Sequence, residues 1–338
     1  MSILRLLLYP FSLFYGAYII ARNILFDIKI LRSYKSTARV ISVGNITTGG
    51  TGKTPFVIFL AEMLLNLDKS VCVISRGYKR KSDGLVVGFD GNKICGDISS
   101  VGDELSMIIG RFSRFKNRFY AIADSNRVRA VKYAESEFKP DIILLDDAFQ
   151  HRYIKRDLDI VIVAADQNSL VYKTLIPSGN IREPFACLCR SGLIVRNFKF
   201  SECKDGYPLN TVPEIRVCYD YDGIFDALGN PLESEIKKVV AVSGIADNKS
   251  FFNALKKFGY DVIRAFEFGD HHSYSQQDID SIMNQSESGD VFVATEKDFI
   301  KLKYFANFTG ERRVYYLKLK IKCDSERLKD ILVEKRIL

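Results

Sequence analysis

The sequence contains no tryptophan, only three histidines and no C-x-x-C pair among its seven cysteines. The closest cysteines, Cys187 and Cys189, are separated by one residue and have no histidine nearby, which does not fit the usual zinc-binding patterns. An odd number of scattered cysteines also argues against a disulfide framework. We therefore expect free thiols and a reducing compartment.

Long apolar segments are also scarce. The apolar run at the amino terminus, from Leu6 to Ala21, has sixteen residues and is broken by Pro10 and Gly16. A membrane-spanning helix needs about 20 apolar residues. This run is therefore predicted not to cross a bilayer.

The composition is otherwise that of a folded protein. The 338 residues are 47% hydrophobic and 27% charged, which excludes a disordered or collagen-like chain. At about 150 residues per domain, the length predicts two domains, each large enough to have its own core.

Positive charge is concentrated at the amino terminus. The net charge of the chain is +8, and residues 1–40 contain six basic residues and one acidic residue, a local charge of +5. Basic residues mixed with aliphatic and aromatic ones are typical of a helix that lies in a membrane interface. A signal peptide fits less well, because only Arg5 precedes the apolar run and the same pattern continues past Ala21. The remaining interpretation is an amphipathic helix that packs on its own domain.

A glycine-rich loop follows the first predicted strand, residues 39–44. The loop has the sequence NITTGGTGKT, and a helical pattern begins at Pro55. Strand, glycine-rich loop, Gly-Lys-Thr and helix is the order of a P-loop, in which backbone N–H groups and the start of the helix bind phosphate. Lys53 would contact the β- and γ-phosphates, and Thr54 would ligate Mg²⁺.

The loop departs from the strict P-loop pattern at one position, where Thr47 replaces a glycine. Its Gly49–Thr54 core resembles the loops of ParA-like ATPases, although Thr48 stands where those proteins have an additional lysine. A glycine-rich turn without a ligand is the structural alternative.

Two adjacent aspartates, Asp146 and Asp147, end an apolar segment that is predicted to be a buried strand. This is the arrangement of a Walker B element, which brings carboxylates to the sheet edge that carries the loop. Adjacent carboxylates repel each other unless a cation lies nearby, so Mg²⁺ would account for the pair. A solvated acidic turn is the alternative. A second apolar strand is predicted over 158–166.

The three histidines lie beside acidic or amide side chains. His151 follows Gln150, and His271 and His272 follow Asp270 in a polar turn before a predicted helix. Such histidines are suited to proton transfer or to hydrogen bonding with phosphate, and a structural role is open for each.

Two further acidic residues, Asp103 and Glu104, begin a helical stretch between the loop and the Walker B strand. A helix cap followed by a favourable first-turn acid explains them without any catalytic role.

Seven ordered segments resemble the tetraacyldisaccharide 4'-kinase family, the lipid A 4'-kinases of Gram-negative bacteria. They are VGNITTGGTGKTP (43–55), SRGYKR (75–80), VGDE (101–104), DDAFQHR (146–152), SGNIREP (178–184), DHHSY (270–274) and TEKDFIKL (295–302). The apolar amino terminus also resembles the membrane-associated helix of that family. The chain departs from the family pattern at Lys79, Leu105 and Ala148, where glycine, proline and glycine are usual.

The resemblance implies a kinase that uses ATP and Mg²⁺ to phosphorylate the 4'-hydroxyl of a lipid A disaccharide precursor. It implies a peripheral location at the cytoplasmic face of the bacterial inner membrane. The expected partners are the lipid precursor and the anionic membrane surface, with no nucleic acid and no evident obligate protein partner.

The resemblance also assigns roles to individual residues. The catalytic residues are the base Asp103, its partner His271, preferred over His272, and Lys53. The nucleotide-binding residues are Thr47, Thr48, Gly49, Gly50, Thr51, Gly52, Lys53 and Thr54. The metal-binding residues are Thr54, Glu104, Asp146 and Asp147. The substrate-binding or supporting residues are Arg76, Tyr78, Arg127, Gln150, His151, Arg182 and His272.

The implied fold class is α/β, with a P-loop NTPase-like three-layer α/β/α domain and a smaller α/β/α domain joined by a two-stranded linker. The expected boundaries are 1–35 for the membrane-associated segment, 36–212 for the core domain, 213–237 for the linker, 238–311 for the smaller domain and 312–338 for the return strand and C-terminal helix. Strands are predicted over 214–220, 238–244, 290–295 and 312–320.

Other nucleotide-dependent functions compete with this assignment. A membrane-attached ParA-like ATPase that acts as a nucleotide switch would share the loop, but it would have the lysine that Thr48 replaces. Thr295–Asp298 has the wrong spacing for guanine recognition in a GTPase. A nucleic-acid ATPase is disfavoured because the basic residues cluster with apolar ones instead of forming a groove with interleaved aromatics.

Overall fold

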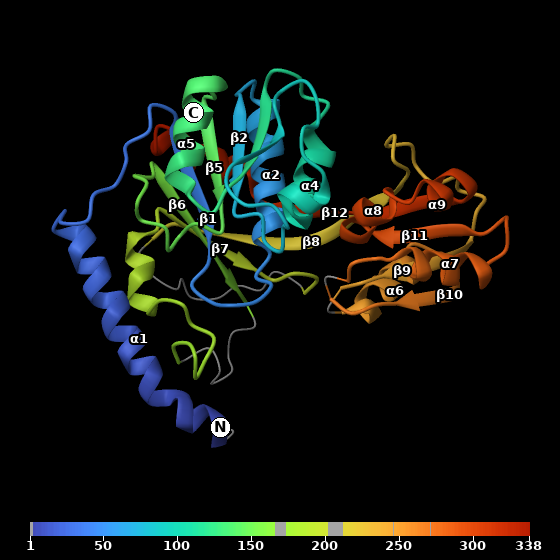
Figure 1. The fold of residues 1–338 in the computed structure, drawn as a ribbon, viewed down its shortest axis with the longest axis horizontal. Helices are drawn as coiled ribbons and strands as arrows, with labels where there is room; N and C mark the ends of the chain where they lie inside the picture. The colour runs from blue at the N-terminus through green and yellow to red at the C-terminus, as the bar shows by residue number, and fades with distance from the viewer. Residues whose placement is uncertain (1–2, 166–173, 202–211, 246, 271) are drawn as a thin grey trace. The chain divides into compact units, whose positions relative to one another are not determined.

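The computed structural model describes residues 3–165, 174–201, 212–245, 247–270 and 272–338 (Figure 1). The chain divides into two compact units. Unit 1 comprises Met1–Leu105, Arg111–Tyr219 and Ile321–Leu338, and unit 2 comprises Ser106–Gly110 and Asp220–Lys320.

The sheet of unit 1 is almost entirely parallel, and its strand β1 (Arg39–Gly44) leads directly into the glycine-rich loop. β1 pairs with β5 (Ile142–Asp146) on one side and with β6 (Leu158–Ala164) on the other. The strand order is β7-β6-β1-β5-β2-β4-β3, and only β3 is antiparallel to its neighbour. The other strands are β2 (Val71–Ser75), β3 (Val86–Phe89), β4 (Phe119–Ala123) and β7 (Leu193–Asn197). The α/β class and the strands predicted at 39–44, before Asp146 and within 158–166 are confirmed.

The central strands are buried on both faces, which explains their continuous apolar sequences. Helix α2 (Lys53–Asn66) packs against this sheet through fully buried side chains such as Phe56, Leu60 and Leu64. It begins two residues before Pro55, the predicted start, and a proline in the first turn needs no hydrogen-bond partner. Further helices described in this unit are α3 (Ile98–Val101), α5 (Arg127–Glu137), the 3₁₀ helix η2 (Phe185–Arg190) and α10 (Ser325–Glu334), and α4 (Asp103–Phe112) begins here.

Helix α1 (Ile3–Asp27) runs without interruption through Pro10 and Gly16, so the predicted breaks at these residues are wrong (Figure 1). Pro10 removes only its own N–H from the helix ladder. Gly16 faces the rest of unit 1, where an added Cβ would lie 2.8 Å from Cδ1 of Leu175. Among the described residues, no helix is both long and apolar enough to cross a membrane.

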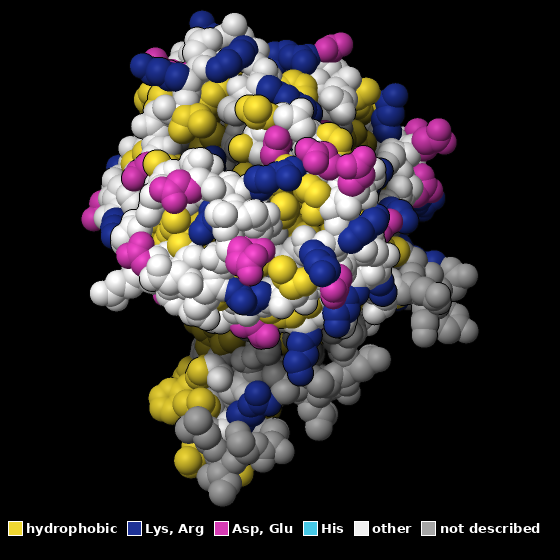
Figure 2. All heavy atoms as spheres, turned by 90° about the vertical axis from the view of Figure 1, so that its right-hand side faces the viewer, with side chains coloured by type: hydrophobic (Ala, Val, Ile, Leu, Met, Phe, Trp, Pro, Cys, Tyr) yellow, Lys and Arg dark blue, Asp and Glu magenta, His cyan; other side chains and the backbone are white. Residues whose placement is uncertain are grey.

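The two sides of α1 differ in character. A buried stripe at helical spacing consists of Ser12, Gly16, Ile19, Asn23 and Phe26. The exposed side carries large apolar side chains, which are 50–76% exposed: Leu6, Leu7, Phe11, Leu13, Phe14, Tyr18, Ile20 and Ile24. Figure 2 shows hydrophobic side chains gathered at the lower end of the molecule, at the height at which α1 begins in Figure 1.

The strands of unit 2 follow the order β10-β9-β11-β12-β8 and belong to the same twelve-stranded sheet as those of unit 1. They are β8 (Glu214–Phe225), which begins in unit 1 beside β7, β9 (Lys238–Ser243), β10 (Asp261–Glu267), β11 (Val291–Thr295) and β12 (Arg313–Cys323). The helices of unit 2 are α6 (Asn248–Lys257), α7 (Gln276–Asn284), α8 (Glu296–Leu302) and α9 (Ala306–Glu311). Two apolar clusters, one containing Phe292 and the other Val293, contribute to the core of this unit. The strands predicted at 214–220, 238–244, 290–295 and 312–320 are confirmed.

One expectation about cysteine is wrong. Cys218 in β8 is disulfide-bonded. Cys72, Cys95, Cys187, Cys189 and Cys323 are free thiols. An odd cysteine count shows only that at least one thiol is unpaired, and a pair distant in sequence leaves no spacing signature.

Candidate active site

The glycine-rich loop connects the carboxyl end of β1 to the start of α2. Gly52 caps α2 with a φ of 90°, in the left-handed region that favours glycine. A Cβ at this position would also overlap the hydroxyl of Tyr219 and the amide of Asn197. Glycine is therefore required here by both backbone conformation and space.

The second half of the loop is held by side-chain amides. Nδ2 of Asn45 donates to Oγ1 of Thr51 over 2.9 Å, and Nδ2 of Asn197 donates to the carbonyl oxygen of Thr51 over 2.9 Å. Asn197 also contacts the hydroxyl of Tyr219 at 2.8 Å. These contacts fix the peptide just before Gly52 and Lys53.

The first half of the loop is held by a short antiparallel bridge. Thr47 pairs with Ile181, the N–H of Thr48 donates to the carbonyl of Asn180 over 2.7 Å, and the N–H of Arg182 donates to the carbonyl of Ile46 over 2.7 Å. The loop is therefore braced on both sides, as a preformed anion site requires.

The predicted nucleotide-binding residues lie together in this loop and at the first turn of α2. Thr47, Thr51 and Thr54 are buried, whereas Gly49 and Gly50 are exposed. The N-terminus of α2 adds its partial positive charge at the same place. The arrangement is suited to binding phosphate oxygens.

Asp147 faces two cations at the carboxyl end of β5. Its Oδ1 lies 3.5 Å from Nζ of Lys53, and its Oδ1 and Oδ2 accept from Nη1 of Arg182 over 3.0 and 3.1 Å. Burial alone would raise the pKa of Asp147, but Lys53 and Arg182 outweigh it and hold the pKa below its ordinary value. A φ of 49° turns the chain at this residue.

Asp146 lies beside the loop, because it pairs in register with Val43 of β1. It is buried, and its Oδ1 has no hydrogen-bond partner among the described residues. Burial, followed by the negative charges of Glu104 and Asp147, raises the pKa of Asp146. A buried carboxylate oxygen without a donor, close to two other acidic groups, fits a cation.

The residues present fit Mg²⁺ better than an all-protein metal cage. In the described part of the chain, no three His, Cys, Asp or Glu side chains are grouped closely enough to hold a metal ion by themselves. Mg²⁺ is commonly held by one or two carboxylates together with phosphate oxygens and water. Thr54, Glu104, Asp146 and Asp147 are the residues that would hold it, with phosphate supplying the rest.

Asp103 and Glu104 form the first turn of α4, as predicted. Both are half-buried, and Gly102 precedes them with a φ of 87°. The charge of Glu104 acts on Asp146. The start of this helix therefore adds negative charge to the Walker B carboxylates.

The other predicted arginines occupy different environments. Arg127 is only 4% exposed, and its Nη1 and Nη2 donate to the backbone carbonyls of Asp124 and Asp146 over 3.0 and 3.2 Å. It therefore joins the ends of β4 and β5. Arg76 and Tyr78 follow β2 and are exposed, Tyr78 by 60%. Because β2 and β5 are parallel neighbours, these side chains start from the same sheet edge as Asp146.

Gln150 and His151 follow the Walker B strand. Nε2 of Gln150 donates to the carbonyl of Asn45 over 2.8 Å, so Gln150 supports the start of the loop. Burial, followed by the charge of Arg127, lowers the pKa of His151 to about 4. His151 is therefore neutral near pH 7, and its buried Nδ1 has no partner among the described residues.

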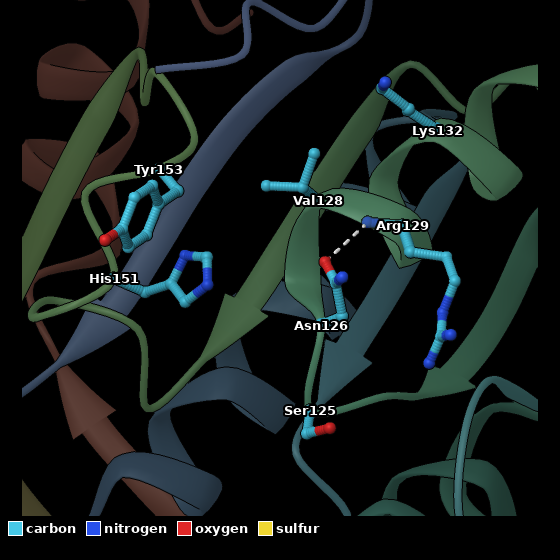
Figure 3. A pocket seen from close by; sticks show the side chains of 7 residues that line it. All are labelled: Ser125, Asn126, Val128, Arg129, Lys132, His151 and Tyr153. Atoms are coloured by element: carbon cyan, nitrogen blue, oxygen red, sulfur yellow. Dashed lines mark hydrogen bonds between the residues drawn. The ribbon is translucent and has the colours of Figure 1, made fainter. Parts of the chain in front are cut away.

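His151 also lines an open pocket of about 630 Å³ in unit 1 (Figure 3). His151 and Tyr153 form one side. The residues on the other side come from the end of the β4–α5 connection and from α5 itself: Ser125, Asn126, Val128, Arg129 and Lys132. Hydroxyl, amide and aromatic groups in one concave site are suited to binding a polar ligand.

In unit 2, the imidazole of His272 is held locally. Its Nε2 lies 3.1 Å from Oδ2 of Asp278, its ring stacks on Phe268 at 4.6 Å, and its carbonyl accepts from Nζ of Lys301 over 2.8 Å. His271 lies outside the described residues. The predicted pairing of Asp103 with His271 stays a prediction.

Several contributors to the site have no motif that reveals them. Asn45 begins the loop and is the one that the local sequence suggests. Asn197 and Tyr219 lie far along the chain, and only the fold brings them to Thr51 and Gly52.

Comparison with known proteins adds an independent finding. The family model described as tetraacyldisaccharide-1-P 4'-kinase matches residues 4–336. A tetraacyldisaccharide 4'-kinase of Halothermothrix orenii is 37% identical over 314 residues, covering 85% of this chain and 80% of that protein. The enzyme of the same name from Aquifex aeolicus is 32% identical over 333 residues, covering 97% and 98% of the two chains.

The fold is also similar to a solved structure. The crystal structure of LpxK from Aquifex aeolicus in complex with ATP superposes with a TM-score of 0.83 at 31% sequence identity. The match covers 98% of this chain and 99% of that one.

Proposed function

Because the chain belongs to the tetraacyldisaccharide-1-P 4'-kinase family, we propose that it transfers the γ-phosphate of ATP to the 4'-hydroxyl of a tetraacyldisaccharide 1-phosphate. The observation that carries the proposal is the loop between β1 and α2 together with Lys53, Asp147 and Arg182 at its edge. This group combines donors for phosphate with carboxylates for a cation.

The glycine-rich loop would bind the nucleotide. The backbone N–H groups of the loop and the start of α2 would hold the phosphates, with Lys53 on the transferring group. Arg182 would either stay on Asp147 or move to a phosphate oxygen, since a guanidinium suits both. Bound Mg²⁺ supplies charge neutralisation on the phosphates.

Activation of the acceptor hydroxyl is assigned to Asp103. A sugar hydroxyl is a poor nucleophile, and a carboxylate can accept its proton as the new P–O bond forms. The proton moves from the 4'-oxygen to a carboxylate oxygen, and ADP leaves with the electron pair of the broken bond. His271, the neighbour of His272 in sequence, is the proposed partner that orients this base.

Binding of the sugar and its phosphate is assigned to the exposed Arg76 and Tyr78 and to the pocket that His151 lines. A neutral imidazole can both donate to and accept from sugar hydroxyls. Arg127 would support this region by holding the ends of β4 and β5 together through its hydrogen bonds to the carbonyls of Asp124 and Asp146.

The membrane surface is the proposed location of the reaction, at the cytoplasmic face of the inner membrane. The exposed apolar side of α1 and the basic residues around it are suited to an anionic lipid interface. Deletion of residues 1–31 is expected to release the protein from anionic vesicles in a sedimentation assay. Undiminished binding would move the membrane site elsewhere.

The decisive experiment uses γ-labelled ATP and a lipid A disaccharide 1-phosphate in detergent. Label is expected on the lipid, at the 4'-position. ATP hydrolysis without label on the lipid would instead favour a nucleotide switch of the ParA-like type.

A further inference from the structure

The inner side of α1 makes specific polar contacts that membrane attachment does not need. Oγ of Ser12 donates to the carbonyl of Leu175 over 2.9 Å and accepts from the N–H of Ser178 over 3.0 Å. Nδ2 of Asn23 contacts Sγ of Cys187 at 3.7 Å. Contacts of this kind hold a helix in one position, whereas a simple apolar anchor could slide or rotate.

One contact of α1 leads to the phosphate site through Arg182. The hydroxyl of Tyr15 donates to the carbonyl of Arg182 over 2.8 Å. The N–H of the same residue donates to Ile46 in the loop, and its guanidinium binds Asp147. Arg182 therefore joins α1, the loop and the Walker B carboxylate.

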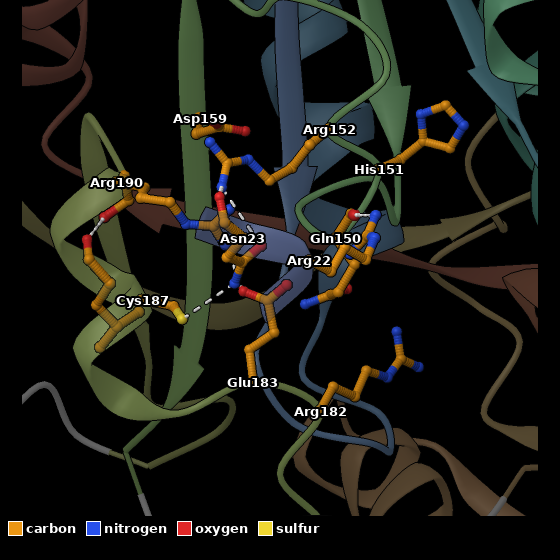
Figure 4. A network of polar contacts seen from close by, with 12 residues as sticks. Arg22, Asn23, Gln150, His151, Arg152, Asp159, Arg182, Glu183, Cys187 and Arg190 are labelled. Carbon is orange, nitrogen blue, oxygen red and sulfur yellow. Dashed lines mark hydrogen bonds and ion pairs between the residues drawn. The ribbon is translucent and has the colours of Figure 1, made fainter. Parts of the chain in front are cut away.

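A second contact leads there through Gln150. Nη2 of Arg22 donates to the carbonyl of Gln150 over 2.7 Å, and the side chain of Gln150 donates to the carbonyl of Asn45 over 2.8 Å. The guanidinium of Arg22 lies 5.4 Å from the ring centroid of Phe26 and 6.0 Å from that of Tyr153, which fixes its direction. Figure 4 shows the contact between Arg22 and Gln150, with Arg182 in the same view.

We propose that Tyr15 and Arg22 are positioning residues for the phosphate loop, acting from α1 through Arg182 and Gln150. The inference rests on the proposed function, because it takes ATP as the ligand of the loop. Donors that must meet phosphate oxygens are most effective when they are oriented in advance. The start of the loop is held at Asn45 by Gln150 and at Ile46 by Arg182. Because α1 contacts both Gln150 and Arg182, it supports both of these attachments.

Two substitutions and two matched controls test the proposal. Tyr15→Phe removes a single oxygen, and Tyr18→Phe makes the same change on the exposed side, where Tyr18 is 62% exposed. Arg22→Met removes the guanidinium, and Arg32→Met removes the same charge from an exposed position just beyond the helix.

The first measurement is the Kd of ATP with Mg²⁺ in detergent, without the lipid acceptor. Loss of one hydrogen bond of average strength corresponds to about 5-fold, and loss of a charged donor to about 10-fold or more. Tyr15→Phe is expected to weaken ATP binding about 5-fold and Arg22→Met about 10-fold. Tyr18→Phe and Arg32→Met should bind ATP as the unmodified chain does, and Arg22→Lys should recover part of the loss.

Vesicle binding and thermal unfolding separate positioning from general damage. Tyr15→Phe should bind anionic vesicles as Tyr18→Phe does, and Arg22→Met as Arg32→Met does. With saturating acceptor, KM for ATP should rise more than kcat falls. Unchanged ATP affinity in both Tyr15→Phe and Arg22→Met, or a lowered Tm as the sole effect, would refute the positioning role. If the unmodified chain fails to bind ATP, the proposed function fails and this inference fails with it.

Discussion

Asp147 in unit 1 and Asp278 in unit 2 are both held by ion pairs or hydrogen bonds, but their partners are of different types. Asp147 binds the side chains of Lys53 and Arg182 at the end of a strand. Asp278 accepts from the N–H and Oγ of Ser275, both over 2.8 Å, and completes the capping box of α7. The partners of Asp147 are charged side chains, whereas Asp278 is bound by Ser275, the N-cap of its own helix, and by the nearby His272.

This difference indicates which carboxylates are available to a ligand. Side-chain cations can exchange one anionic partner for another, so a phosphate or a cation can enter the group around Asp147. A carboxylate that caps a helix is committed to local structure, since its release leaves backbone N–H groups without partners. The Asp147 carboxylate in unit 1 is therefore available to a ligand, whereas Asp278 in unit 2 stabilises the start of α7.

The largest expected effect tests the ligand-binding side of this comparison. Lys53→Ala should lower kcat/KM about 10³-fold, because a preorganised cation on the transferring phosphate is lost. The Tm should change little, since Arg182 still pairs with Asp147. The measurement is steady-state transfer to the lipid acceptor, with exposed Lys329→Ala as the control. Near-normal turnover in Lys53→Ala would remove this lysine from the phosphate site.

The next effect concerns Asp103, where a catalytic base and a first-turn acid give different outcomes. Asp103→Asn should lower kcat about 10²-fold while leaving the Kd of ATP nearly unchanged. Asp324→Asn, which alters the N-cap of α10 in the same unit, is the matched control and should keep full turnover. If Asp103→Asn reduces only stability, by about 0.3–1 kcal/mol, the residue merely complements the helix dipole.

A smaller effect is expected on the structural side of the comparison. Asp278→Ala should lower the free energy of unfolding by about 1–2 kcal/mol, because a capping box and the contact with His272 are lost. Chemical denaturation followed by circular dichroism measures the change. Asp280→Ala on the same helix, an exposed residue, should cost much less. Equal losses in the two variants would contradict the assignment of Asp278 as the cap.

The smallest effect is a pH dependence in unit 1. The pKa of His151 is lowered from 6.5 to about 4, so between these values the unfolded chain binds a proton that the folded chain does not. Stability from this group is therefore complete above about pH 6.5 and decreases as the pH falls toward 4. His151→Gln should reduce the stability lost between pH 7 and pH 5 by about 1 kcal/mol, allowing for solvent screening. Identical pH profiles would place the histidine in a solvated environment.

Much of unit 1 was predictable because its signals are local. The phosphate loop needs a strand, small residues and a helix start in direct succession, and residues 39–66 contain all three. The carboxylates at Asp146 and Asp147 follow from an apolar run that ends in acid. Because β1 and β5 pair in parallel, the loop and these carboxylates lie at the same edge of the sheet, and no long-range pattern is needed to predict this.

The braces of the loop were not predictable in this way. Asn180–Arg182 reaches the loop from more than 130 positions away, and Asn197 from almost 150. The resemblance identifies 178–184 as a family segment and Arg182 as a supporting residue, but no pattern indicates that 180–182 or Asn197 contacts the loop, because hydrogen bonds to backbone carbonyls are made by many side chains and by the backbone itself. The continuity of α1 was missed for the opposite reason: local rules about proline and glycine are weaker than the packing of Gly16 against Leu175.

The two sides of α1 have a consequence for the order of events at a membrane. On the proposed function, α1 supports the phosphate loop through Arg182 and Gln150 on one side and meets lipid on the other, which makes ATP binding and membrane binding reciprocal. If a lipid surface stabilises the seated helix and the seated helix favours ATP, ATP must strengthen attachment to the surface by the same factor. The chain would then remain longest at the membrane when ATP is bound, and it would dissociate more readily after phosphate transfer.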